Sequence, residues 1–448
     1  MLVILSDLHF SDGSLAREAA GGAGSAPASE GWNIPARAFR YLADDLRAII
    51  ENPNINVREV RLVLLGDVFD LLRSAEWRKP GPSPWDAPSG ELEARAGAIL
   101  RGVSAENDLA FSEIRDLKEM LGLLAERVHV HYIPGNHDRL VNLFASTRRI
   151  AAETLGLEPG AQPPEAPFAH EYRSDEYGVF ARHGQEFDGL NWAGSYEAAG
   201  LGEAVVVRLF NEFPARARRR LDPADPETAP LLERLEELDH VRPLWAVPRW
   251  FQGVLVAATK ESTRRALSEA WAETAAAFAA DPFVRGKMSP WNPLAAANLA
   301  ARLVRTPWGL AERLCRLKPL RWLVDDSDAK YARAAAAETR NQPFDAAQGR
   351  AFGPGTRNQE PGTRNCVVYG HTHVGRQVAL DVRAGMPLMY FNSGTWRRVV
   401  CPAELGRYAG SAADARPFAS WQVMDYLLLY RPEENRGYRF ETWQGTRG

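Results

Sequence analysis

Short apolar runs, each followed by a small polar cluster, are the feature that most constrains the fold of this chain. The runs lie at 2–5, 60–65, 128–133, 179–181, 366–369 and 388–391. Runs of this length are typical of strands that are buried on both faces, as in parallel sheets. Stretches with helical periodicity, such as 36–51 and 113–127, lie between them. We therefore expect an α/β fold in which the polar clusters meet at the carboxyl ends of the strands.

The distribution of these patterns divides the chain into four parts. From about 195 to 338 strand patterns are lacking and helical patterns dominate. Residues 339–365 repeat a Thr-Arg-Asn unit amid Pro, Gly and Gln, a composition typical of a segment that buries no core. Strands near 421–428 and 438–443 would complete the sheets. The predicted parts are a core in two pieces, 1–194 and 366–448, a helical insertion that selects the substrate, 195–338, and a flexible linker, 339–365.

Composition and charge restrict the class of protein. With 45% apolar and 25% charged residues the chain is typical of globular proteins, and its net charge of −3 makes nucleic acid an unfavoured partner. The three cysteines lie far apart in sequence and show no Cys-x-x-Cys spacing, which argues against a thiolate zinc site or a disulfide framework and fits a reducing compartment. We find neither a secretion signal nor an apolar run of the ~18 residues that a membrane span requires. We therefore expect a cytoplasmic protein.

Five polar clusters, each just after a predicted strand, contain residues that commonly bind metals. They are Asp7-Leu-His9, Gly66-Asp67-Val-Phe-Asp70, Gly135-Asn136-His137-Asp138, His183-Gly184 and Gly370-His371-Thr-His373. Imidazole, carboxylate and amide groups together suit manganese, iron, zinc or cobalt better than calcium, which prefers oxygen ligands alone. A carboxylate between two cations ~3.5–4 Å apart can bridge them. The clusters therefore predict a site for two divalent cations.

The five clusters resemble the motifs of the calcineurin-like metallophosphoesterase superfamily: D-x-H, G-D-x-x-D/E, G-N-H-D/E, a lone His and G-H-x-H. The chain has all five in this order, within roughly 1–190 and 366–400. The resemblance implies a four-layer α/β/β/α sandwich with the site at the strand ends where the two sheets meet. It also implies two bound metal ions, manganese first and iron, zinc or cobalt as alternatives. Water activated between them would attack a phosphate ester or anhydride without a covalent phosphoenzyme.

The resemblance assigns a ligand role to seven residues. One metal would be held by Asp7, His9, Asp67 and His373. The other would be held by Asp67, Asn136, His183 and His371. Asp67 is the bridging ligand in this scheme, and His183 is the ligand with the shortest motif.

The remaining residues of the motifs have roles beside the metals. By resemblance, His137 would protonate the leaving oxygen or stabilise phosphoryl charge, and Asp138 would orient its ring. Asp70 is expected to be structural or to support a ligand. The pair His129 and His131 is interpreted as one face of a half-exposed strand rather than as ligands.

Two further segments have open interpretations. Residues 392–396 either support the site from a neighbouring strand or form a structural turn. Residues 299–324 carry six basic residues and one acidic residue interleaved with Leu and Trp. They could lie at the inner face of a membrane, or they could be a solvated helix face packed by its leucines.

The leading hypothesis is a hydrolase of phosphomonoester, phosphodiester or pyrophosphate bonds with a small-molecule or lipid-linked substrate. One alternative is a nuclease of the same superfamily, although the mild acidity of the chain gives it little support. Another is a metal-binding scaffold that recruits partners through the helical insertion. The sequence carries no signal for an oligomeric state.

Overall fold

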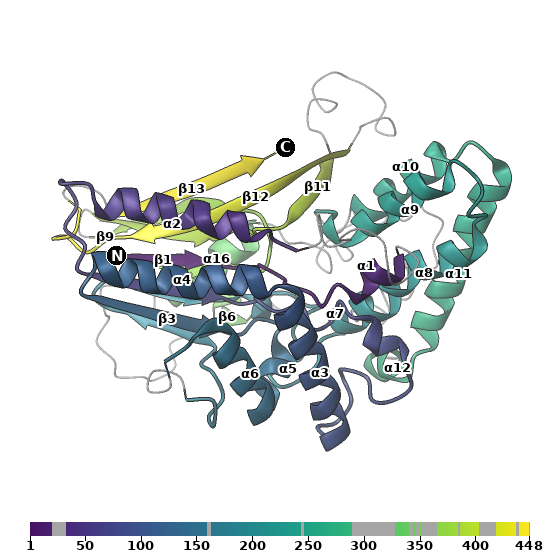
Figure 1. Ribbon diagram of the computed structural model, residues 1–448, viewed down its shortest axis with the longest axis horizontal. Coiled ribbons are helices and arrows are strands. Elements are labelled where there is room, and N and C mark those ends of the chain that lie inside the picture. Colours follow the sequence, from purple (N-terminus) through teal and green to yellow (C-terminus); the bar gives the residue numbers. More distant parts are fainter. Residues whose placement is uncertain are drawn as a thin grey trace. The chain divides into compact units, whose positions relative to one another are not determined.

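The computed structural model of the chain is mixed α/β and contains two mixed β-sheets, which confirms the predicted class (Figure 1). The structure describes residues 1–19, 33–158, 163–242, 246–288, 328–339, 344–345, 350–351, 365–383, 386–402, 418–435 and 439–447. The basic segment 299–324 and most of the expected linker 339–365 lie outside these residues.

The chain divides into two compact units. Unit 1 comprises Met1–Phe187, Ser327–Arg397 and Gln422–Arg447. Unit 2 comprises Asp188–Asp326, Arg398–Trp421 and Gly448. Unit 1 therefore contains every candidate site residue, and it also contains 328–338, which the sequence interpretation assigned to the insertion.

The first sheet has the strand order β11-β12-β1-β2-β3, with β13 paired to β12. Its strands are β1 (Leu2–Leu5), β2 (Glu59–Leu65), β3 (Arg127–Ile133), β11 (Arg398–Pro402), β12 (Phe418–Leu429) and β13 (Phe440–Arg447). Strands β1, β2 and β3 are parallel, whereas β12 is antiparallel to both β1 and β13. The parallel pairing brings the loops after β1, β2 and β3 to one edge of the sheet.

The second sheet has the order β4-β5-β8-β10-β9. Its strands are β4 (Glu171–Ser174), β5 (Val179–Arg182), β8 (Cys366–Tyr369), β9 (Arg376–Arg383) and β10 (Met386–Asn392). Here β5, β8 and β10 are parallel, and the edge strands β4 and β9 run antiparallel to their neighbours. A separate two-stranded sheet pairs β6 (Phe344–Asp345) with β7 (Arg350–Ala351).

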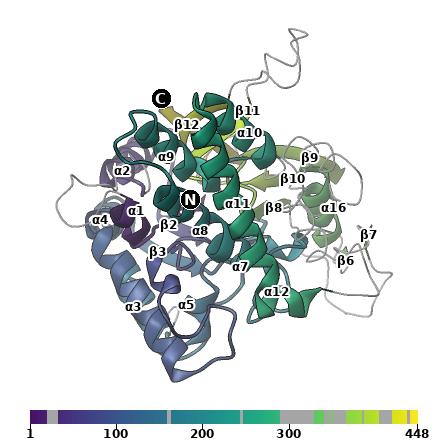
Figure 2. The same ribbon diagram turned by 90° about the vertical axis from the view of Figure 1, so that its right-hand side faces the viewer.

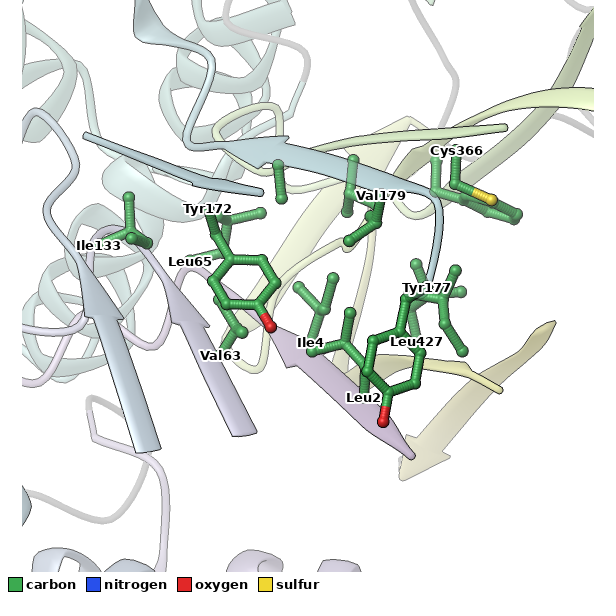
Figure 3. Close-up of a cluster of buried hydrophobic side chains, with 14 of the residues drawn as sticks. Leu2, Ile4, Val63, Leu65, Ile133, Tyr172, Tyr177, Val179, Cys366 and Leu427 are labelled. Atoms are coloured by element: carbon green, nitrogen blue, oxygen red, sulfur yellow. The ribbon is translucent and has the colours of Figure 1, made fainter. Parts of the chain in front are cut away.

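A buried apolar cluster joins the two large sheets. Leu2, Ile4 and Val63 of the first sheet pack with Val179 and Val368 of the second, and all five are at most 1% exposed (Figure 3). Every second residue of these strands contributes, because successive side chains point to opposite faces. Burial of one such side chain contributes about 1.5–3 kcal/mol, so this cluster fixes the position of the strand ends relative to one another.

Helices of unit 1 pack on strands of both large sheets. They are α1 (Ser14–Ala19), α2 (Ala36–Ile50), α3 (Gly90–Glu106), α4 (Asp108–Leu124), α5 (Arg139–Leu143), α6 (Ala145–Leu155) and α16 (Asp328–Glu338), with short helices η1 (Ala75–Arg78) and η2 (Gln185–Phe187). Helix α4 packs on α2 and β3, and α16 packs on β8, β9 and β10 of the second sheet (Figure 2). The helix predicted at 113–127 corresponds to α4, which begins earlier than predicted, at Asp108. It also ends earlier, at Leu124, because Arg127 already pairs with Glu59 as the first residue of β3.

The described part of unit 2 is mainly helical. Its helices are α7 (Leu201–Ala204), the π-helical turn η3 (Val205–Phe210), α8 (Glu212–Arg220), α9 (Thr228–Glu236), η4 (Glu237–His240), α10 (Val247–Ala257), α11 (Glu261–Ala280) and α12 (Pro282–Lys287). Phe213, Phe251 and Trp271 form an aromatic cluster that joins α8, α10 and α11. Of the helices described in either unit, none is long and apolar enough to cross a membrane.

Candidate metal centre

The loops that follow five strands bring the predicted ligands together. Asp7 and His9 follow β1, Asp67 follows β2, Asn136 follows β3, His183 follows β5, and His371 and His373 follow β8. Three groups of side chains have their ligand atoms within 4.8 Å of one another. These groups are Asp7 with His9 and His373, His9 with Asp67 and His137, and Asp67 with His183 and His371. The shared members His9 and Asp67 join the three groups into one centre.

The Asp67 carboxylate lies between two sets of imidazoles. Its Oδ2 is 3.6 Å from His9 Nε2 and 3.1 Å from His183 Nε2. On the His9 side, His373 Nε2 is 2.9 Å from His9 Nε2 and 3.3 Å from Asp7 Oδ1. Asp67 therefore has the central position that a bridging ligand requires.

Asn136 adjoins Asp67 through the backbone. The next residue, His137, donates its N–H to Asp67 Oδ1 over 2.8 Å. A Cβ atom at the preceding Gly135 would overlap Asp67 Oδ1 and approach His183. The close approach of this loop to Asp67, rather than a sharp turn at Gly135, explains the glycine. Asn136 itself is 8% exposed.

Two of the imidazoles are oriented by hydrogen bonds of their Nδ1 atoms. His183 Nδ1 lies 3.1 Å from the carbonyl oxygen of Leu65, and His9 Nδ1 lies 3.2 Å from Asp70 Oδ2. An Nδ1–H held in this way leaves Nε2 with its lone pair for a metal. Both Nε2 atoms face Asp67, so the two rings present these nitrogens to the central carboxylate.

Burial and opposite charge act against each other in the centre. Burial raises the pKa of Asp7, but the charge of His183 and the nearby imidazoles of His373 and His9 outweigh it and hold the pKa well below its usual range. Burial likewise raises the pKa of Asp67, and His183 and His137 outweigh it. The pKa of His183 is raised, because Asp67 and Asp7 outweigh the effect of burial. The carboxylates are thus ionised, as metal binding requires.

The backbone is strained at the ligands. Asp7, His9, Asp67, His371 and His373 have φ angles of 54°, 48°, 51°, 71° and 61°. In the described part of the chain, no other non-glycine residue has a positive φ. Such conformations cost roughly 1–3 kcal/mol each and concentrate at functional sites. This feature was not predicted from the sequence, although Asp and His are among the residue types that tolerate a positive φ.

Of the motif glycines that precede Asp67, Asn136 and His371, Gly66 alone requires conformational freedom. Its φ is 84°, and a Cβ atom there would overlap the His183 ring. Gly370 does not have a positive φ, but a Cβ atom there would lie 2.7 Å from Asp7 Oδ2. Of these three glycines, only Gly66 therefore needs a left-handed backbone, whereas at Gly135 and Gly370 a neighbouring carboxylate leaves no room for a side chain.

The orientation of His137 differs from the sequence expectation. Its Nδ1 lies 2.8 Å from Asp70 Oδ1, so Asp70 rather than Asp138 holds the ring. Asp138 is fully buried, and its oxygens accept hydrogen bonds from the backbone N–H groups of Val68, Phe69 and Gly135. Asp138 thus ties the loops after β2 and β3 together. Burial and the charge of Asp67 raise its pKa to about 7.

Residues 392–396 support the centre, which decides between the two interpretations of this segment. Thr395 Oγ1 donates to the carbonyl oxygen of Asp7 over 2.7 Å, and the Ser393 and Ser6 hydroxyls lie 2.7 Å apart. Arg397, which the sequence analysis did not assign to the site, is 5% exposed and has Nη1 3.8 Å from Asp70 Oδ2. The segment therefore holds the end of β1 and approaches the carboxylate that orients His137.

Two other histidines do not contribute to this centre. His129 and His131 lie within β3, and His129 Nε2 is 3.8 Å from Glu59 Oε1. Burial lowers the pKa of His131 to about 4. Their half-buried positions agree with the interpretation of one strand face.

The donor set fits divalent transition metals. Asp7 Oδ1 and His183 Nε2 are buried, yet within the described residues neither makes a hydrogen bond of normal geometry. Buried polar atoms are rarely left in this state, and here both face other potential ligands. The mixture of imidazole and carboxylate suits manganese, iron, zinc or cobalt.

The comparisons with known proteins do not add to this description. The chain matches no protein-family model, and neither the curated proteins nor the solved structures yield a match. A function for the chain must therefore be inferred from its motifs and from the geometry of the centre.

Proposed function

We propose that the chain is a metallophosphoesterase with two divalent cations, which hydrolyses a phosphomonoester, phosphodiester or pyrophosphate bond. The observation that carries this proposal is the position of Asp67, whose carboxylate belongs to the group with His9 and to the group with His183 and His371. A shared carboxylate of this kind is what a pair of cations needs.

We also propose membership of the calcineurin-like metallophosphoesterase superfamily and its four-layer α/β/β/α arrangement. The five motifs support it, as do the apolar cluster between the two sheets and the packing of α4 on β3 and of α16 on the second sheet. In this proposal one cation is held by Asp7, His9, Asp67 and His373. The other is held by Asp67, Asn136, His183 and His371.

When bound, the two cations, with manganese as the first choice, would lower the pKa of a water molecule and withdraw charge from the phosphate oxygens. The residues of the chain orient the reacting groups and supply protons. Asp67 keeps its negative charge between the two sets of imidazoles, and the N–H of His137 fixes the orientation of the Asp67 carboxylate.

His137 is proposed as the proton donor to the leaving oxygen or as a stabiliser of phosphoryl charge. Its side chain is 13% exposed, and its Nδ1 is held by Asp70. In the protonated ring the Nε2–H group would be the donor to the leaving oxygen. A small-molecule or lipid-linked phosphate compound is the proposed substrate class.

The test compares metal content with turnover. Metal-free protein is loaded with manganese, and zinc, cobalt and iron are tried separately. Bound metal is counted by mass spectrometry, and hydrolysis of p-nitrophenyl phosphate, bis-p-nitrophenyl phosphate and a UDP-linked sugar lipid is measured. We expect two metals per chain and manganese-dependent hydrolysis of at least one substrate.

Three variants sharpen the result. Asp67→Asn should lose both metal and turnover, and His137→Ala should retain two metals but lose about 10²–10⁴-fold in rate. Asp381→Asn, an exposed aspartate on β9, is the matched control and should change neither. Two bound metals with no hydrolysis of any substrate would support a metal-binding scaffold instead. Absence of metal binding would contradict the proposal altogether.

A further inference from the structure

A second polar pocket lies between the two sheets of unit 1, next to the metal-binding loops. It has a volume of about 280 Å³ and is lined by residues of β9, β10, β12 and β13. We call it the Asp425 pocket and define it by Gln377, Phe391, Asp425, Leu427, Thr442 and Gln444. None of these residues has a role in the proposed function.

Strand pairing shows which side chains face this pocket. Asp425 of β12 lies opposite Gln444 of β13, whereas the next pair, Tyr426 and Trp443, stacks on the other face of the sheet. Tyr426 donates to Asp45 of α2, so that face looks toward the helix. Because side chains alternate along a strand, Asp425 and Gln444 face the space between the sheets, as the core residue Leu427 does.

The carboxylate of Asp425 is the unusual feature of this pocket. Asp425 is 4% exposed, and its Oδ1 has no hydrogen-bond partner within the described residues. In that part of the chain Asp425 also makes no ion pair. Two glycines approach it closely: a Cβ atom at Gly375 would lie 2.7 Å from Oδ2, and one at Gly394 would overlap it.

The buried carboxylates of the metal centre lie beside imidazoles that stabilise their charge. Asp70 is as buried as Asp425, but its oxygens lie 2.8 Å and 3.2 Å from the imidazoles of His137 and His9. Among the described residues Asp425 has no such partner, and burial raises its pKa to about 7. An ionised carboxylate is costly in such a place unless a cation or several donors reach it.

The rest of the lining is suited to a nitrogen cation. Gln377, Thr442 and Gln444 are exposed and surround the opening, whereas Phe391 and Leu427 are buried. The amide oxygens of the glutamines can accept N–H groups. Arg376 also lines the pocket, but it is exposed and alternates with Gln377 along β9, so its side chain points to the opposite face of the sheet. One carboxylate with neutral amides is a poor set of ligands for a divalent metal ion.

We propose that the Asp425 pocket binds the cationic nitrogen group of a small molecule, a primary ammonium or a guanidinium, against the carboxylate of Asp425. The glutamine amides accept the remaining N–H groups, and the apolar base excludes water from one side. The group belongs either to the phosphate substrate or to a separate molecule. Gly375 lies two residues after His373, and Ser393 of the lining bonds Ser6 beside Asp7, so a ligand here adjoins the metal-binding loops.

Calorimetry with butylguanidinium tests the binding, and the uncharged butylurea of similar shape is the matched probe. With metal-free full-length protein, we expect saturable binding of butylguanidinium and binding of butylurea that is weaker by about tenfold or more. Asp425→Asn should weaken butylguanidinium binding by a similar factor, whereas the control Asp381→Asn should not change it. Circular dichroism establishes that the variants fold.

The two possible sources of the group are then separated with manganese-loaded protein. Competitive inhibition of p-nitrophenyl ester hydrolysis by butylguanidinium assigns the pocket to the substrate, and non-competitive inhibition or activation assigns it to a separate ligand. No binding to the unaltered protein, equal binding of the urea, or unchanged binding to folded Asp425→Asn would each overturn the proposal. Because the binding test uses no metal and no turnover, its failure is distinct from failure of the proposed phosphoesterase.

Discussion

Replacement of Asp425 by Asn should stabilise the protein at neutral pH. Burial raises the pKa of this carboxyl from its ordinary value of 3.8 to about 7. The folded protein therefore holds the Asp425 proton over a pH range in which the unfolded chain has already lost it. Asn resembles the protonated acid in shape and cannot ionise, so the variant avoids this penalty.

The sign and size of the effect follow from proton linkage. The stability of the unaltered protein falls as pH rises from about 4 to about 7, because the unfolded state then binds fewer protons than the folded state. The difference between 3.8 and about 7 corresponds to about 4 kcal/mol above pH 7. At pH 5 the same reasoning gives about 2 kcal/mol, and below pH 4 the two proteins should be nearly equal.

The assay is urea unfolding of metal-free protein followed by tryptophan fluorescence at pH 4, 5 and 8. Urea is preferred to guanidinium chloride, because guanidinium is the kind of ion that we expect the Asp425 pocket to bind. Other groups titrate in both proteins, so the difference between them isolates Asp425, and Asp381→Asn is the control for loss of an exposed charge. A variant that is less stable at pH 8, or a difference that does not change with pH, would refute the reasoning.

Three further predictions concern the metal centre. Manganese at about 100 times its Kd should stabilise the unaltered protein by about 2.7 kcal/mol for each of the two bound cations, seen as a higher melting temperature in calorimetry, and Asp67→Asn should show no such shift. Asp70→Asn removes the charged partner of His137, so kcat should fall by at least about tenfold. The loss should be larger for alkyl phosphates than for p-nitrophenyl phosphate, because their poor leaving groups need a proton. Equal losses for both substrates would contradict this role of Asp70. Gly66→Ala should lower the free energy of unfolding in urea by several kcal/mol and should reduce the metal content, because φ is 84° there and the new methyl group overlaps His183. Unchanged metal content would show that the loop can shift.

The sequence predicts the α/β class and the convergence of the polar clusters for a simple physical reason. Buried parallel strands are apolar along their whole length, and their carboxyl ends meet at one edge of a sheet. Loops after β1, β2, β3, β5 and β8 therefore had to carry the ligands. The edge strands β4 and β9 were missed, because an exposed edge strand such as Arg376–Arg383 alternates polar and apolar residues and lacks an apolar run.

The partner of His137 could not be predicted in the same way. Asp138 is adjacent in sequence, whereas Asp70 is far away in the chain and reaches His137 only because β2 and β3 are parallel neighbours. Adjacent side chains often diverge, and the backbone after β3 turns Asp138 toward the N–H groups of Val68, Phe69 and Gly135. The role of Thr395 required the fold as well, since its hydroxyl meets the carbonyl oxygen of Asp7 across the two sheets.

The strained backbone supports cation binding at this centre independently of the side chains. The five non-glycine residues that have a positive φ in the described part of the chain are five of the seven predicted ligands. At about 1 kcal/mol or more each, their strain is a substantial fraction of the 5–15 kcal/mol that usually separates folded from unfolded proteins. Packing between the sheets can hold a residue in this conformation, but packing does not explain why the strain occurs at these five residues. The location of the strain is explained if the side chains must converge, because a left-handed residue after a strand turns the next side chain back toward the sheet edge. Cation binding at these residues would then offset both the backbone strain and the cost of burying the charges of Asp7 and Asp67. For this reason manganese should stabilise the fold as well as activate hydrolysis.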